Sequence, residues 1–106
     1  MLQRRVIGEQ DVVAAFQRAG LPLRRFTASG AAAQFTASTP KLNPAVVVAV
    51  FPTEQAARRS VTSLAINGKR VHAIALRNVR IFVAAQATSD VRRNVAHALA
   101  FLRRVK

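Results

Sequence analysis

The sequence contains no cysteine, tryptophan or tyrosine, and only 4 of its 106 residues are glycine. Without cysteine there is no disulfide framework, no thiolate metal ligand and no cysteine nucleophile. The glycines, Gly8, Gly20, Gly30 and Gly68, are too far apart for a GxGxxG or Walker-type phosphate loop. The longest apolar run, residues 45–52, is far shorter than the span of about 20 residues that crosses a membrane. Nucleotide-dependent enzymes and membrane-spanning proteins are therefore disfavoured.

Acidic residues are also scarce, and each falls at or near the expected start of a helix, where the helix dipole favours it: Glu9, Asp11, Glu54 and Asp90. Two positions apart on a helix, Glu9 and Asp11 do not face each other, so they do not form the carboxylate pair of an acid–base site. His72 and His97 have no acid near them in the sequence, and no metal site is expected. There is no Gly-x-Ser-x-Gly elbow. A non-enzyme without cofactor is favoured, with a dispersed Ser–His–Asp site as the alternative.

Positive charge dominates what remains, because 17 Lys and Arg residues face 4 acids and give a net charge of +13. All the cations are arginines except Lys41, Lys69 and Lys106. A GC-rich genome explains the preference for arginine but not the shortage of acids. A charge of this size accelerates association with polyanions, so a nucleic acid, an anionic membrane surface or an acidic protein is the expected partner. The alternative is that the charge serves solubility alone.

Hydrophobic periodicity and turn residues divide the chain into alternating elements. The expected elements are a helix over 9–19, an extended segment over 21–26, a long loop over 30–44 that admits a short strand around 34–37, a strand over 45–51, a helix over 54–64, strands over 70–76 and 79–85 joined by a turn at Arg77-Asn78, and a last helix that begins near Asp90. Gly20 stands at the position that closes the first helix.

This order predicts one α+β domain over residues 1–106. Its expected architecture is a two-layer sandwich with helices on one face of a mostly antiparallel four-stranded sheet, in the order αββαββα. A circularly permuted ferredoxin-like fold would show the same order. This is a similarity of topology, and it carries no function.

The last helix has the clearest pattern, with an apolar stripe on one face and four arginines on the other: Arg92, Arg93, Arg103 and Arg104. Guanidinium groups suit bidentate contacts with phosphate. Further arginine pairs and the last residue extend the expected polyanion-binding set: Arg58, Arg59 and Lys106. Phe51 and Phe82 are expected to pack in the sheet, so binding would be directed to the nucleic-acid backbone and would depend little on base sequence.

The main hypothesis is therefore a non-catalytic domain that binds a polyanion, most simply nucleic acid, through an arginine-rich helix face. The alternative is a protein-interaction or structural module, either a homodimer or an accessory domain of an exported protein. Glu9 and Asp11 interrupt any hydrophobic region of a signal peptide, so a cytoplasmic location is expected. An exported protein whose targeting segment has been removed stays as the alternative.

Overall fold

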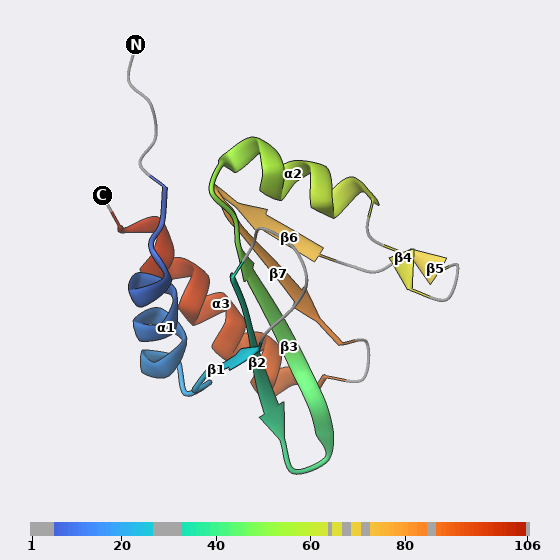
Figure 1. The fold of residues 1–106 in the computed structure, drawn as a ribbon. Helices are drawn as coiled ribbons and strands as arrows, with labels where there is room; N and C mark the ends of the chain where they lie inside the picture. The colour runs from blue at the N-terminus through green and yellow to red at the C-terminus, as the bar shows by residue number, and fades with distance from the viewer. Residues whose placement is uncertain are drawn as a thin grey trace.

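The fold is described from a computed structural model that covers residues 6–26, 33–63, 65–66, 69–70, 73–84 and 87–105. Helices and strands follow one another along the chain as Figure 1 shows. Their bounds are α1 (Glu9–Arg18), β1 (Arg24–Phe26), β2 (Ala33–Thr39), β3 (Leu42–Val50), α2 (Glu54–Ser63), β4 (Ala65–Ile66), β5 (Lys69–Arg70), β6 (Ala73–Leu76), β7 (Val79–Val83) and α3 (Ser89–Arg103).

The main sheet has five strands in the order β1-β2-β3-β7-β6, and every neighbouring pair is antiparallel. The predicted α+β class is confirmed, with one more strand than the four expected. Because β3 and β6 are both antiparallel to β7, they run parallel to each other, and α2 is the crossover that connects them. This split β–α–β unit is the part of the described fold that corresponds to the expected ferredoxin-like topology.

The predicted long loop over 30–44 is wrong for most of the residues that the structure describes, whereas the short strand admitted around 34–37 is present as part of β2. Residues 33–39 form β2, and β3 already begins at Leu42, so only a tight turn at 40–41 separates the two strands. Phe35 pairs with Val48, and Ala37 pairs with Val46. The register then shifts between Ala37 and Thr39. The opposite part of β3 contains a proline, which has no N–H to donate to the hydrogen-bond ladder, so pairing is interrupted here.

The predicted strand over 70–76 is also divided. Its first residue belongs to β5, which pairs with β4 as a separate two-stranded hairpin, whereas β6 begins at Ala73. The turn at Arg77-Asn78 is confirmed, because Leu76 pairs with Val79 across it. Arg77 has a φ of 54°. A positive φ at the first central residue is the conformation of a type II′ hairpin turn, a position that usually carries glycine.

Gly20 closes helix α1 as expected, two residues after its last helical residue, and has a φ of 88°. The N–H of Leu21 donates to the carbonyl of Phe16, and the N–H of Gly20 donates to that of Gln17. These two bonds define a Schellman motif, in which the residue after the C-cap adopts the left-handed conformation that glycine accepts without strain. Leu21 and Phe16 are both buried, so the same turn directs the chain from α1 back into the core.

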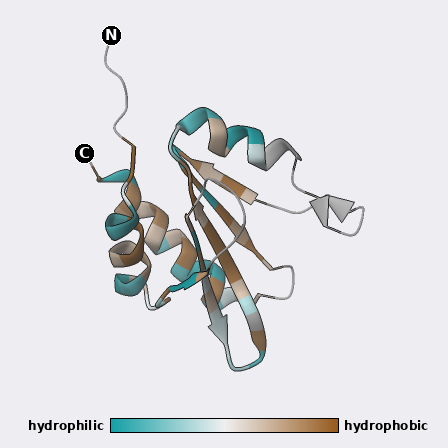
Figure 2. Ribbon diagram, in the orientation of Figure 1, coloured by the Kyte–Doolittle hydropathy of each residue, from teal (hydrophilic) through white to brown (hydrophobic). Residues whose placement is uncertain are grey.

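Strand alternation directs one row of side chains toward α1 and α3. Val46 and Val48 of β3, with Ile81 of β7, form one buried cluster with α1 residues such as Phe16 and α3 residues such as Leu102. Figure 2 shows the corresponding hydrophobic colour along β3 and β7. The predicted helical layer is therefore made by α1 and α3, which also pack against each other.

Helix α2 is the exception to a single helical layer. It packs against β6 and β7, and none of its residues whose side chains are described, 54–60, belongs to the cluster under α1 and α3. Ala49 points to the other side of β3 from Val48, and both Ala49 and Ala57 of α2 are fully buried outside that cluster. Figure 1 shows the sheet between α2 and the pair α1 and α3. The prediction of helices on one face thus holds for α1 and α3, whereas α2 lies on the opposite face.

One buried polar side chain, Asn78, connects distant parts of the fold. Its Oδ1 accepts a hydrogen bond from the N–H of Ile7 at 2.6 Å, and its Nδ2 donates to the carbonyls of Ile7 at 2.9 Å and Phe51 at 2.8 Å. In the neighbouring position, Nη1 of Arg77 donates to the carbonyl of Val105 at 2.8 Å. The β6–β7 turn therefore holds the segment before α1 and the segment after α3 at the same end of the molecule.

Candidate functional site

Helix α3 presents the arginine-rich surface because its other side is fixed in the core. Its buried residues lie on the side that packs against α1 and the sheet: Val91, Val95, Ala98, Leu99 and Leu102. Thr88 is the N-cap, and its Oγ1 accepts a hydrogen bond from the N–H of Val91 at 3.3 Å. The rotation of the helix is set by these contacts. As a result Arg92, Arg93, Arg103 and Arg104 are all exposed.

The four arginines form two pairs, one at each end of this exposed surface, which we call the α3 surface. Arg92 and Arg103 are eleven positions apart, which corresponds to about 16 Å along the axis and nearly the same direction around it. Exposed Ala96, His97 and Ala100 lie between the pairs. The two alanines are small, so an extended anion on their side of the helix can contact both guanidinium pairs, with His97 beside its path.

Each pair has a different local environment. A carboxylate oxygen of Asp90 lies 3.5 Å from Nη1 of Arg93, and Nε of Arg92 donates to the carbonyl of Ala87 at 3.4 Å. At the other end of α3, none of the described carboxylates is within ion-pair distance of Arg103 or Arg104. The C-terminal pair therefore has the less compensated charge, although the negative end of the helix dipole stabilises cations there.

The other predicted site residues do not extend the α3 surface. Arg58 and Arg59 are exposed on α2, which lies on the other side of the sheet from α3, and Arg58 pairs with Glu54 at 3.7 Å. Lys106 lies outside the described residues, as does His72. The structure thus brings together the four α3 arginines and separates the α2 pair from them.

Arg80 of β7 is a charged side chain that the sequence analysis did not single out. It lies on the same side of the sheet as Ala49 and Ala75, its partners on the two adjacent strands. Its guanidinium carbon is 5.5 Å from the centre of the Phe51 ring, in a cation–π arrangement. Its Nε is buried and has no hydrogen-bond partner among the described residues, and burial lowers the pKa of Arg80 through desolvation. The small alanines on both sides make room for this side chain.

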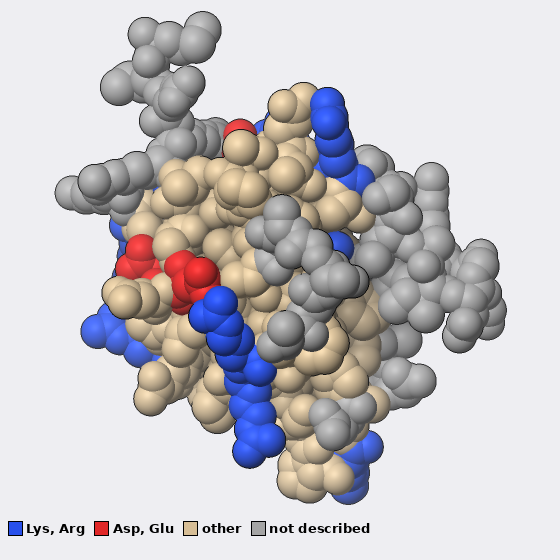
Figure 3. All heavy atoms as spheres, viewed as in Figure 1, with Lys and Arg blue, Asp and Glu red and all other residues tan. Residues whose placement is uncertain are grey.

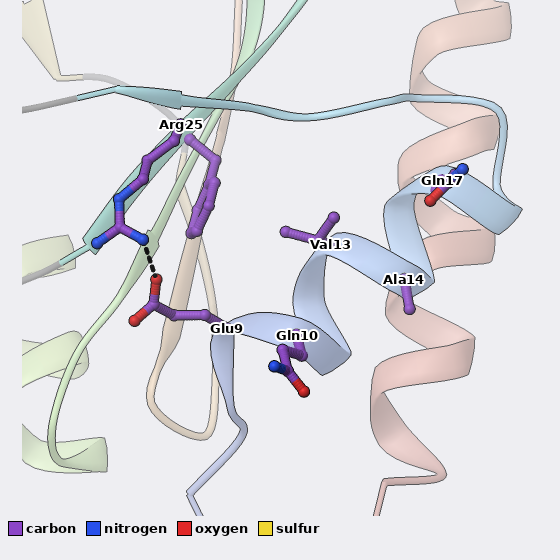
Figure 4. Close-up of a pocket in the computed structure, with 7 residues that line it drawn as sticks. Glu9, Gln10, Val13, Ala14, Gln17 and Arg25 are labelled. Atoms are coloured by element: carbon purple, nitrogen blue, oxygen red, sulfur yellow. Dashed lines mark ion pairs between the residues drawn. The ribbon is translucent and has the colours of Figure 1, made fainter.

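A shallow open depression lies between α1 and the β1–β2 edge of the sheet, with a volume of about 580 Å³. Phe35 and Val13 supply its apolar part, and Gln10 and Gln17 line it from α1. Figure 4 shows Arg25 reaching from β1 toward Glu9 at the start of α1, and the closest N–O distance is 3.1 Å. Glu9 was predicted only to favour the helix dipole, and the structure adds this ion pair between α1 and β1.

Two of the four acids, Glu9 and Asp11, lie in the first turn of α1, whereas Glu54 lies in that of α2 and Asp90 in that of α3. Figure 3 shows a red cluster on the side of α1, next to a cationic side chain, and blue side chains elsewhere around the rim of this view.

No protein-family model matches the chain, and no curated protein or solved structure matches it. Among the described residues, there is no group of three or more His, Asp and Glu side chains arranged to hold a metal ion. None of the helices over these residues is both long enough and apolar enough to cross a membrane.

Proposed function

We propose that this domain is non-catalytic and binds a polyanion, most simply the phosphate backbone of a nucleic acid, through the α3 surface. The observation that supports this proposal best is the two-sided construction of α3. Its apolar side is fixed in the core, and four exposed arginines stand at the ends of its outer side. Arginine pairs about 16 Å apart are suited to separate phosphates along one backbone.

The positions of the acids support the non-catalytic part of the proposal. All four carboxylates lie in the first turn of a helix, where they interact favourably with the helix dipole: Glu9, Asp11, Glu54 and Asp90. Three of them also pair with an arginine. Each acid therefore has a structural role that needs no substrate.

The test is a binding titration with a fluorescent random-sequence duplex and a single strand between about 50 and 200 mM salt, where counterion release makes the affinity fall steeply. The probe variant carries R92Q, R93Q, R103Q and R104Q. The matched control carries R24Q, R25Q, R58Q and R59Q, so that both have four charges fewer than the +13 of the wild type. We expect the α3 variant to lose about three to four units of the slope of log K against log salt, and the control to lose less than half as much.

Two results would overturn the proposal. If the wild type binds neither nucleic acid at low salt, the charge does not serve this function. If both variants lose the same slope, binding follows net charge and the α3 surface has no special part in it. Anionic vesicles form a further arm of the titration, and binding to vesicles alone would replace nucleic acid by a membrane surface as the partner.

A further inference from the structure

The two edges of the main sheet differ in a way that concerns association. β1 forms one edge and carries the exposed arginines Arg24 and Arg25. Charged side chains on a three-residue strand are a common protection against edge-to-edge pairing. β6 forms the other edge with the residues Ala73, Ile74, Ala75 and Leu76, and has no charged side chain. Figure 2 shows its hydrophobic colour.

The hydrogen-bond ladder shows which backbone groups of β6 point outward. The N–H of Phe51 donates to the carbonyl of Asn78, and the N–H of Ala84 donates to the carbonyl of Ala45. The backbone N–H and C=O groups of the even-numbered residues along β7 therefore point toward β3. Those of the odd-numbered residues, such as Val79 and Ile81, point toward β6. In the described residues, their partners are Leu76 and Ile74.

It follows that the backbone groups of Ala73 and Ala75 point away from the sheet. The backbone groups of Leu76 and Ile74 point toward their partners on β7. No described strand pairs with the outer side of β6. The side chain of Ile74, on the α1 and α3 side of the sheet, is 41% exposed. An edge with unpaired N–H and C=O groups beside an exposed isoleucine is a template for another strand.

We propose that β6 pairs with β6 of a second copy of this chain, in an antiparallel arrangement about a twofold axis at Ile74. Antiparallel neighbours directly opposite each other lie on the same face of a sheet, so the axis must pass through a residue position rather than between two. With the axis at Ile74, Ala73 of each copy lies opposite Ala75 of the other. Each of these two pairs exchanges two backbone hydrogen bonds, which uses all the outward groups of both residues.

The same register buries the exposed isoleucines against each other. The Ile74 pair occupies the non-hydrogen-bonded site at the centre, where Cα atoms are about 4.5 Å apart and side chains are closest. It also keeps Arg77, the cation that directly follows β6, apart from its copy, because the two are six strand positions from each other, or about 20 Å. A second copy suits this edge better than β1, where pairing with a copy would bring the exposed arginines together.

Net charge gives the association a distinctive salt dependence. Each chain carries +13, so two copies repel each other at long range, and salt screens this repulsion. The contacts at β6 are apolar and backbone hydrogen bonds, which salt does not weaken. We therefore expect dimer formation to increase with ionic strength, whereas polyanion binding decreases with it. The interface does not depend on the proposed function of the α3 surface, and the opposite salt effects keep the two tests separate.

The experiment is sedimentation equilibrium over about 10 µM to 1 mM protein, at about 0.1 and 1 M NaCl. We expect the mass to rise from 11.5 kDa toward twice that value, and to rise further at the higher salt. Ile74→Lys should restore the single-chain mass. Phe26→Lys adds the same charge on the opposite edge, at a side chain that is 49% exposed, and should leave the association unchanged.

A second variant distinguishes loss of the interface from a folding defect. Ala75→Pro removes an outward N–H without removing any donor of the β6–β7 ladder, a position where an edge strand tolerates proline. It should also give the single-chain mass, and circular dichroism should show a folded protein. A single-chain mass for the wild type at the highest protein and salt concentrations would overturn the proposal. So would a dimer that survives Ile74→Lys but not Phe26→Lys.

Discussion

The side chain of Asn78 and the backbone of Ile7, 71 positions apart in the sequence, satisfy each other's hydrogen bonds in both directions. Oδ1 accepts from the N–H of Ile7, Nδ2 donates to its carbonyl, and both residues are buried with 1% exposure. The second hydrogen of Nδ2 reaches the carbonyl of Phe51. One amide thus replaces the strand partner that the segment before α1 lacks at this point.

Replacing Asn78 with alanine should lower the free energy of unfolding by about 3 kcal/mol, because it leaves the buried N–H and carbonyl of Ile7 and the carbonyl of Phe51 without this partner. Asn78→Asp has nearly the same shape and keeps an acceptor, but its carboxylate lacks both donors. It should be destabilised at least as much at pH 7. Urea denaturation measures both values. A loss below about 0.5 kcal/mol for either variant would contradict the role assigned to this amide.

Arg77 combines a hydrogen bond with an unfavourable backbone conformation, and two substitutions separate them. Both Arg77→Ala and Arg77→Gly remove the bond from Nη1 to the carbonyl of Val105, but only glycine accepts the φ of 54° without steric cost. We expect the glycine variant to be more stable than the alanine variant by about 1 kcal/mol in chemical denaturation. Equal stabilities would show that the turn changes its conformation when the arginine is removed.

Arg80 is expected to cost stability rather than supply it. Desolvation lowers its pKa, so the folded state disfavours the charged form at every pH below that pKa, and the penalty declines only in strongly alkaline solution. Arg80→Leu keeps contact with the Phe51 ring and removes the unpartnered Nε. Its free energy of unfolding at pH 7 should equal or exceed the wild-type value by up to about 1 kcal/mol. A loss above 1 kcal/mol would show that the cation–π contact outweighs desolvation.

The N-cap of α3 offers a test of how the arginines are positioned. Thr88→Ala removes the acceptor for the N–H of Val91 and should cost about 1 kcal/mol of stability, whereas Thr88→Ser keeps the hydroxyl and should cost less than half of that. Amide hydrogen exchange at Val91 should accelerate in the alanine variant. Unchanged exchange there would mean that the first turn, with Arg92 and Arg93, does not depend on the cap.

Local patterns predicted the elements whose signals lie within a few residues. The helix bounds near Glu9 and Glu54, the Schellman glycine at Gly20 and the hairpin turn at Arg77-Asn78 all agree with the structure to within a residue where it is described. The two faces of α3 were also evident, because apolar and basic residues separate at helical spacing over four turns. The exposed arginine pairs of the candidate site follow from that separation.

The features that were missed depend on partners far along the chain. β2 contains few large apolar residues besides Phe35, and becomes a strand because the long, β-branched β3 pairs with it. The position of α2 on the other side of the sheet depends on strand order and on the handedness of the connection from β3 to β6, which no local pattern contains. The Glu9–Arg25 ion pair and the contacts of Asn78 join segments that only the tertiary fold brings together. The same reason explains why the sequence did not show that Arg58 and Arg59 lie on the other side of the sheet from the α3 arginines.

The packing of α1 on α3 has a consequence for synthesis of the chain from its N-terminus. Within this domain α1 leaves the ribosome before the other elements, whereas its main helical neighbour α3 leaves after them. The apolar face of α1, including Phe16, cannot pack against α3 until about 80 further residues have been made, which takes roughly 4 to 16 s at usual translation rates. β2 and β3 are joined by a tight turn, so their pairing needs no residue that is made later. We therefore expect the N-terminal helix to join the nascent domain at the end of folding rather than at its beginning.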